Sequence, residues 1–170
     1  MNIILIGMPG CGKSTVGVLL AKALQCTFVD CDLIIQKRCG MSLQEIIDRR
    51  GLSEFLAEEE ATLCAMNEDG SVIATGGSAV YSQAAMEHLG ANSIILYLSL
   101  PCEEIERRLT NIKTRGVAMS KGVTIASLFE ERCPLYERWA DITLDAYGLD
   151  IEQTVDRAVE MINSYQHSRK

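Results

Sequence analysis

A short apolar segment, IILI at residues 3–6, runs directly into the glycine-rich segment GMPGCGKST at residues 7–15. This segment matches the pattern G-x-x-x-x-G-K-[ST], which has a physical meaning when a strand precedes it and a helix follows it. Glycines let the backbone curl until successive N–H groups point at one spot, and the positive end of the helix dipole points there too. The segment therefore predicts a strand, a phosphate-binding loop, a helix and a nucleoside triphosphate site.

The side chains of this loop have separate expected roles. Lys13 can reach the β- and γ-phosphates, and the Ser14 hydroxyl can ligate Mg²⁺. Thr15 fits an early helix position better than a ligand position, although it belongs to the same motif. The loop residues that we expect at the nucleotide are Gly10, Cys11, Gly12, Lys13, Ser14 and Thr15.

Length and charge limit the classes of protein that this chain can belong to. With 170 residues it is expected to form one domain with a sizeable core. Its net charge of −7 argues against a general binder of nucleic acid or of anionic membranes. No apolar run approaches the ~18 residues of a membrane span, and the first residues lack the features of a signal peptide. We expect a monomer without nucleic-acid or membrane partners.

The cysteines indicate the compartment rather than a site. Seven are present, an odd number, and none forms a C-x-x-C pair, so neither a disulfide framework nor a zinc site is predicted. Several stand where a small apolar residue would fit. A cytoplasmic location follows, because free thiols persist in a reducing compartment.

The rest of the chain alternates short apolar runs with longer segments of helical periodicity. The expected strands are Ile3–Ile6, Thr27–Val29, Val72–Ala74, Ile94–Leu98 and Ile142–Leu144. The expected helices are Ser14–Leu24, Ser42–Arg50, Glu54–Asn67, Glu103–Leu109, Ile125–Arg138 and Glu152–Tyr165. Such alternation predicts an α/β fold in which helices cover both faces of a parallel sheet.

Two further segments suggest function. Residues 110–123 carry three basic residues and two glycines without an apolar stripe, which fits either a mobile lid or a solvated loop. Asp30 and Asp32 follow the second expected strand, and ligand sites of parallel sheets lie at the carboxyl ends of strands. One carboxylate could hold Mg²⁺ while the other faces an acceptor hydroxyl. Alternatively, one of them simply caps the next helix.

Five motifs occur in a familiar order: GMPGCGKST, DCD at 30–32, GGSAV at 76–80, TR at 114–115 and ERCPLYERWAD at 131–141. In this order and spacing the chain resembles the shikimate kinase family over residues 1 to about 165. The resemblance implies a three-layer α/β/α fold of the P-loop NTPase type, with a five-stranded parallel sheet. It also implies one domain over 1–170, with a substrate-binding helical region at about 31–65 and a lid at about 110–123. The implied reaction transfers the γ-phosphoryl group of ATP to a hydroxyl of shikimate, with ATP and Mg²⁺ as cofactors.

The resemblance also assigns residues on the nucleotide side. Lys13 and Ser14 hold phosphates and Mg²⁺, and Asp30 supports the metal. Arg115 corresponds to a lid arginine that reaches the transferring phosphate, which places it with Lys13 among the catalytic residues. Arg108 matches a position that stacks on adenine, where a guanidinium plane suits a π-face.

On the acceptor side the resemblance implies four residues. Asp32 is the catalytic acid that hydrogen-bonds the acceptor hydroxyls and helps to activate one of them. Gly76 and Gly77 are the glycines whose backbone lies against the acceptor ring. Arg132 stands where the family places an arginine on the acceptor carboxylate. A surface ion pair with Glu130 or Glu131 is the alternative for Arg132, but the spacing does not favour it.

Three positions depart from the family pattern. Leu56 stands where the motif G-x-x-x-F-R-x-x-E has an arginine that binds the acceptor carboxylate, and losing such a bond costs ~1.5–3 kcal/mol. Ser78 replaces a third glycine and could bind an acceptor or cap the next helix. Gly116 follows Arg115 where proline is common, which favours a more flexible lid. The departures concern the acceptor and the lid, whereas the phosphate loop keeps the family pattern.

Two alternatives to a shikimate kinase therefore stay open from the sequence. The first is a kinase of the same fold for another small polyhydroxy compound or hydroxy acid, suggested by Leu56. The second is a nucleotide-binding protein that has lost transfer activity. Turnover on a panel of hydroxylated acceptors separates all three hypotheses.

Overall fold

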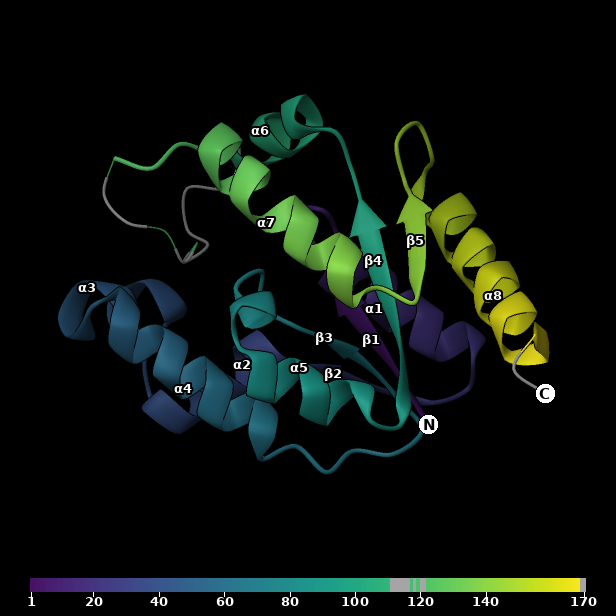
Figure 1. Cartoon of the computed structure of the whole chain (residues 1–170), viewed down its shortest axis with the longest axis horizontal. Helices are drawn as coiled ribbons and strands as arrows, with labels where there is room; N and C mark the ends of the chain where they lie inside the picture. The colour runs from purple at the N-terminus through teal and green to yellow at the C-terminus, as the bar shows by residue number, and fades with distance from the viewer. Residues whose placement is uncertain (111–116, 118, 120–121, 169–170) are drawn as a thin grey trace.

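A five-stranded parallel sheet forms the centre of the molecule in a computed structural model that describes residues 1–110, 117, 119 and 122–168. The strand order is β2-β3-β1-β4-β5 (Figure 1). The strands are β1 Asn2–Ile6, β2 Thr27–Asp30, β3 Ser71–Ala74, β4 Ser93–Ser99 and β5 Ile142–Asp145. All five expected strands are therefore present, within two residues of the predicted ends.

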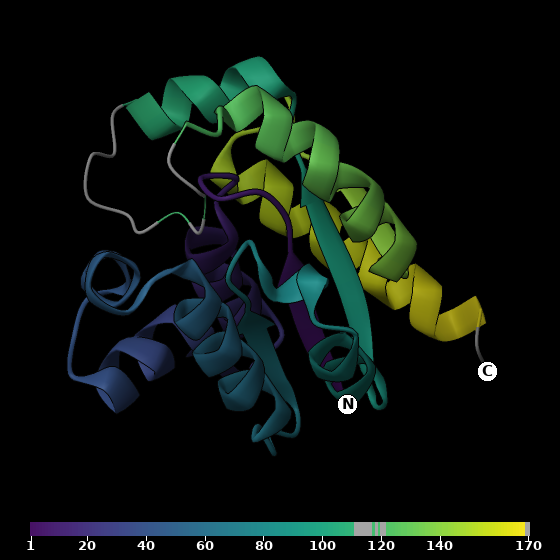
Figure 2. The same ribbon diagram turned by 60° about the vertical axis from the view of Figure 1, so that its left-hand side comes forward.

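Helices cover both faces of this sheet, which confirms the predicted three-layer α/β/α fold. On one face α1, Lys13–Ala23, packs against α8, Ile151–Ser168. On the other lie α5, Gln83–Gly90, and α7, Ile125–Trp139 (Figures 1 and 2). The short helix α6, Cys102–Thr110, packs against α7.

The strand sequences explain why the sheet sits between layers. The central strand β1 pairs with β3 through Ile3 and Val72 and with β4 through Ile3 and Ile94. The residues of β3 and the first six of β4 are buried, so both faces of these strands are apolar, as a doubly covered parallel sheet requires. The edge strand β5 instead alternates buried and exposed residues, because only one of its faces meets the core.

Three helices between β2 and β3 form a unit beside the sheet. They are α2, Cys31–Cys39, α3, Leu43–Arg50, and α4, Leu52–Cys64. Ile35, Ile46 and Phe55, one from each helix, make a second apolar core. Ser42 caps α3 by accepting a hydrogen bond from the Glu45 N–H, while Glu45 bonds back to the Ser42 N–H.

Some elements differ from those predicted. Apolar periodicity did not indicate helix α2, helix α5 or the 3₁₀ helix η1, Ala79–Tyr81, because each is short and has few apolar positions. Helix α2 nevertheless lies in the helical region at about 31–65 that the resemblance implies. Helix α4 ends at Cys64 rather than Asn67. Most of the predicted lid at 110–123, including Arg115, lies outside the described residues. No helix in the described part of the chain is long and apolar enough to cross a membrane.

The strand order brings three loops together. Strands β2, β3 and β1 are neighbours, and their carboxyl ends lead into the Asp30–Asp32 segment, the Gly76–Gly77 segment and the phosphate loop. Ligands of parallel sheets bind at such a crevice outside the strand ends. These three loops therefore bring together residues that lie up to about seventy positions apart in sequence.

The contact between α1 and the sheet yields a first prediction. A Cβ on Gly17 would lie 2.5 Å from the Phe28 ring and 3.1 Å from Leu5. We therefore expect Gly17→Ala to overpack this contact and to lower the free energy of unfolding in urea by about 1–3 kcal/mol. Val18→Ala, at the half-exposed next position of α1, is the matched control and should change it by less than about 0.5 kcal/mol. An unchanged midpoint for Gly17→Ala would contradict the tight packing.

Candidate active site

A pocket of about 280 Å³ opens where β1, β2 and β3 end. Its walls come from the phosphate loop, α2, the loop after β3, α4 and α7. The residues that line it include Gly10, Gly12, Lys13, Ser14, Asp30, Asp32, Phe55, Glu59, Gly76, Gly77, Ser78, Val117 and Arg132. The pocket therefore brings together most of the predicted phosphate-binding and acceptor-binding residues. Cys11 and Thr15 of the phosphate loop and Arg108 on α6 are not among the residues that line it, and Arg115 lies outside the described residues.

The phosphate loop has the conformation that its glycines predict. Gly12 takes a φ of 108°, which other residues rarely adopt, immediately before α1 starts at Lys13. The Lys13 side chain is buried, and its Nζ donates hydrogen bonds to the carbonyl oxygens of Gly7, at 2.7 Å, and Met8, at 3.0 Å. The ammonium group thus lies within its own loop, beside the N-terminus of α1.

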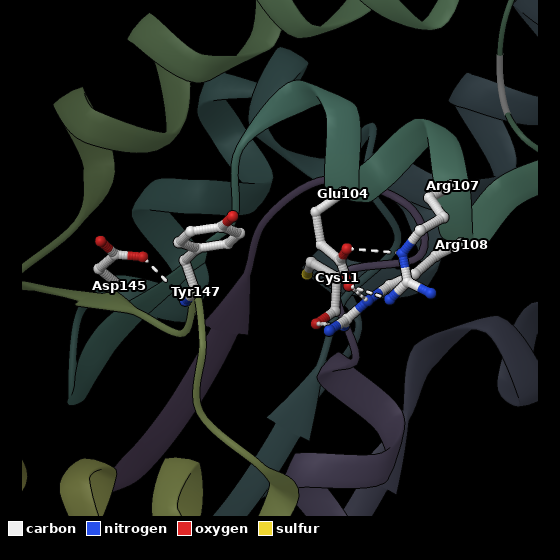
Figure 3. Close-up of polar contacts among 6 residues, drawn as sticks. All are labelled: Cys11, Glu104, Arg107, Arg108, Asp145 and Tyr147. Atoms are coloured by element: carbon white, nitrogen blue, oxygen red, sulfur yellow. Dashed lines mark hydrogen bonds and ion pairs between the residues drawn. The ribbon is translucent and has the colours of Figure 1, made fainter.

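Helix α6 holds Arg108 against the outer side of this loop (Figure 3). The Arg108 Nη1 donates to the Cys11 carbonyl at 3.2 Å, and its Nε donates to Glu104 Oε1 at 2.7 Å. Hydrogen bonds from Arg107 and Arg108 lower the pKa of Glu104 to about 2, so this carboxylate stays charged. Arg107, an exposed residue of the same helix, therefore helps to fix the acid that orients Arg108. Figure 3 also shows Tyr147 after β5, whose N–H donates to Asp145.

The two acidic residues after β2 have different environments. Asp30 caps α2, since its Oδ1 accepts a hydrogen bond from the Asp32 N–H at 3.0 Å. Both residues also line the pocket, as Ser14 does. The helix cap considered as the alternative for Asp30 is therefore present. It uses one carboxylate oxygen, so the other oxygen could still bind a metal ion. Among the described residues no three His, Cys, Asp or Glu side chains cluster as a metal site. A site made of Ser14, Asp30 and phosphate oxygens fits this arrangement, because Mg²⁺ usually keeps few protein ligands.

Gly76 and Gly77 line the pocket in close contact with side chains from other segments. A Cβ on Gly76 would collide with Glu59 Oε1 and lie 3.1 Å from Asp32 Oδ1. A Cβ on Gly77 would lie 2.8 Å from Pro9 Cδ and 3.1 Å from Arg132 Nη1. Only glycine therefore fits at these two positions.

Arg132 is buried in the pocket wall, with only 1% of its surface exposed. Its Nε donates to the Tyr81 hydroxyl at 2.9 Å, and its guanidinium lies 5.0 Å from the centre of the Tyr81 ring. The Tyr81 hydroxyl in turn donates to Glu131 at 2.7 Å. The hydroxyl of Tyr136, one turn further along α7, donates to the Gly77 carbonyl at 2.6 Å. Sequence reasoning missed both tyrosines, although Tyr136 belongs to a motif that it quoted.

Glu59 on α4 was also missed, and it is the most unusual group in the pocket. It is 2% exposed, and its Oε2 accepts a hydrogen bond from Ser78 Oγ at 2.5 Å. The pKa of Glu59 is raised to about 7, mainly because the group is buried and to a smaller extent because Asp32 carries a like charge. The hydrogen bond from Ser78 and the positive charges of Arg132 and Lys13 act in the opposite direction and lower this pKa. Of the two roles considered for Ser78, the helix cap is absent, since its side chain makes no capping bond to η1. The sequence feature that could have identified Glu59 is its position in the family motif G-x-x-x-F-R-x-x-E, whose final glutamate it supplies.

Leu56 lies away from the main pocket. It packs against the second core of Ile35, Ile46 and Phe55, and it lines a separate cavity with Glu59 and Ser78. In the described part of the chain, Arg132 and Lys13 are the cationic residues that line the main pocket. No second arginine there replaces the one that the family pattern has at position 56.

A phosphate loop, two acids and a buried arginine around one small pocket define a P-loop kinase of small molecules. Comparison with known proteins narrows the class: the family model described as shikimate kinase matches residues 9–163, and the chain belongs to this family. The shikimate kinase of Thiobacillus denitrificans is 37% identical over 147 residues, covering 85% of this chain and 80% of that protein.

Two further matches add detail. A solved structure described as the Acinetobacter baumannii shikimate kinase in complex with shikimate has a TM-score of 0.87 and 28% identity, covering 96% of this chain and 93% of the other. Threonine synthase-like 1 of Homo sapiens is 36% identical over 168 residues, or 97% of this chain. The match covers only 23% of that longer protein. The family is therefore established over nearly the whole chain.

Glu59 gives a prediction on stability. Its pKa rises from 4.5 to about 7 on folding, so between these values the folded state holds more protons and stability falls as pH rises. We expect wild type to lose roughly 2–3 kcal/mol of unfolding free energy between pH 5 and pH 8 relative to Glu59→Gln. Urea denaturation at pH 5 and at pH 8 measures this loss of unfolding free energy. Glu60→Gln, at the exposed next residue, should keep the wild-type dependence, and parallel curves for wild type and Glu59→Gln would disprove the shift.

Proposed function

We propose that this chain transfers the γ-phosphoryl group of ATP to the 3-hydroxyl of shikimate, giving shikimate 3-phosphate, within the site described above. The observation that carries the proposal is the pocket itself, which has a volume of about 280 Å³ and is lined by the phosphate loop, Asp32 and the buried Arg132. Membership of the shikimate kinase family and the likeness to a relative described in complex with shikimate support the same acceptor.

On the phosphate side the loop provides charge and alignment. We infer that Lys13 exchanges its bonds to the Gly7 and Met8 carbonyls for bonds to phosphate oxygens. Ser14 and Asp30 would hold Mg²⁺, which neutralises charge on the phosphates when bound. Arg108, already fixed against the loop, presents its guanidinium plane on the side assigned to adenine. Arg115, outside the described residues, is proposed as the lid residue that reaches the transferring phosphate.

On the acceptor side three groups orient the hydroxyl. Asp32 would accept the proton of the attacking hydroxyl as the new O–P bond forms. Arg132 would bind the acceptor carboxylate, because its buried guanidinium is held in one orientation by Tyr81. Gly76 and Gly77 leave the ring room to lie against the backbone. Alignment of this kind is the main requirement of phosphoryl transfer.

Neither alternative from the sequence is favoured. A different acceptor was suggested by Leu56, yet the residues predicted for shikimate share one pocket without it. A binding protein without activity would not need Lys13, Ser14 and Asp32 together. We also propose a cytoplasmic monomer without nucleic-acid partners: all seven cysteines are free, the net charge is −7, and the exposed large apolar side chains are spread over separate elements.

An ADP-release assay over a panel of hydroxylated acceptors tests the function. Shikimate should give turnover well above the water rate, whereas Lys13→Ala should lower kcat by at least about a hundredfold, since charge stabilisation of this kind supplies several kcal/mol. Lys22→Ala, an exposed lysine on the same helix, is the control and should retain the wild-type rate. Turnover with another acceptor but not with shikimate would refute the acceptor assignment.

The hydrogen bond from Arg132 to Tyr81 gives a prediction on affinity. Tyr81→Phe removes the acceptor of the Arg132 Nε bond and leaves a buried donor without its partner, which costs about 1–3 kcal/mol. The KM for shikimate should therefore rise about 5- to 100-fold, while the KM for ATP stays the same. Tyr165→Phe, which loses a bond to Asp141 next to β5, should leave both values unchanged. Equal changes in both KM values would place Tyr81 outside acceptor binding.

A further inference from the structure

Glu59 is a buried acid whose two oxygens have unequal surroundings. Its Oε2 accepts the Ser78 bond, whereas its Oε1 is buried without a hydrogen-bond partner, facing Gly76 at the floor of the pocket. A buried carboxylate with one unsatisfied oxygen is unstable unless cations offset its charge or a proton neutralises it. The protonation of Glu59 therefore depends on which charges lie around it.

The charged groups that act on Glu59 come from three elements. Asp32 on α2 disfavours its ionised form, whereas Arg132 on α7 and Lys13 on α1 favour it. The nearby Cys31 thiol on α2 stays neutral, because burial raises its pKa well above the ordinary value. On the outer side, Tyr81 of η1 and Glu60 line the small cavity that Glu59 shares with Leu56. Both cations that favour the charged form also line the main pocket.

Ligands compete for these same cations. Phosphate groups interact with Lys13, so this lysine stabilises the charge of Glu59 less. An acceptor carboxylate bound to Arg132 adds a negative charge beside the guanidinium that already stabilises the charge of Glu59. Because no second arginine among the described residues lines this pocket, the two carboxylates share one buried cation. Protonating Glu59 removes the repulsion between them and lets its O–H donate a hydrogen bond.

We propose that Glu59 takes up one proton when a carboxylate-bearing acceptor binds to Arg132, and that it thereby makes the affinity for such acceptors depend on pH. The inference rests on the proposed function for the location of the acceptor. A proton simply moves from solvent to Glu59, and no other bond forms or breaks. Ser78 sets the pH at which this occurs, since its hydroxyl stabilises the ionised form.

The direction of the pH dependence follows from linkage. When Glu59 is already protonated in the free protein, acceptor affinity does not change with pH. At higher pH the proton must be taken from solvent, so Kd rises up to about tenfold per pH unit until Glu59 ionises in the complex as well. An acceptor without a carboxylate does not draw on Arg132 and should bind with little dependence on pH.

Calorimetric titration of shikimate into the complex with Mg²⁺ and ADP measures this without turnover. Repeating it at pH 6, 7 and 8 in buffers of different ionisation enthalpy gives the number of protons taken up. For wild type we expect little uptake at pH 6, uptake approaching one proton at pH 8, and a Kd that weakens about fivefold between pH 7 and 8. The methyl ester of shikimate should show no uptake.

Variants assign the proton to its residue. Glu59→Gln should take up none and bind with a Kd that is flat in pH, whereas Glu60→Gln should behave as wild type. Ser78→Ala, which keeps the acid, should move the onset of uptake to higher pH. The inference is overturned if wild type takes up no proton at pH 8, if Glu59→Gln still does, or if shikimate does not bind. ATP turnover with shikimate but without uptake overturns this inference alone, whereas uptake on binding without turnover overturns only the proposed function.

Discussion

The close approach at Gly76 and Gly77 is the constraint on which the site depends. These two residues follow the middle strand of the three that end at the pocket, with Glu59 of α4 on one side and Pro9 and Arg132 on the other. A side chain at either position would separate the acceptor wall from the phosphate loop. The width of the pocket at this point is therefore set by backbone packing, and the proposed phosphoryl transfer needs such fixed alignment.

Around these two glycines the protein buries three charged side chains. Lys13, Glu59 and Arg132 are all buried. Lys13 is held by carbonyls of its own loop, whereas Glu59 and Arg132 are held by Ser78 and Tyr81 from other segments. Electrostatic interactions are strong where water is excluded, so a change in one of these charges affects the others. Binding of ATP and of the acceptor are consequently two events in one electrostatic network.

Local sequence signals predicted the parts of the fold that depend on local chemistry. The apolar strands, the long amphipathic helices and the phosphate loop each have a pattern of their own, and all were found. Helix α2 was missed because its nine residues depend on the Asp30 cap and on packing against α4. Glu59, Tyr81 and Tyr136 were missed because their importance arises from contacts with residues 19, 51 and 59 positions away. Such pairings are set by the strand order, which the motifs alone did not give.

The second apolar core suggests how this architecture diversifies. Ile35, Ile46 and Phe55 tie α2, α3 and α4 into a unit with its own packing, while α6 and α1 hold the nucleotide side. Substitutions inside the three-helix unit, such as leucine at position 56, leave the phosphate loop untouched. New acceptor preferences can thus evolve by mutation of one module, while the chemistry of the other is inherited unchanged.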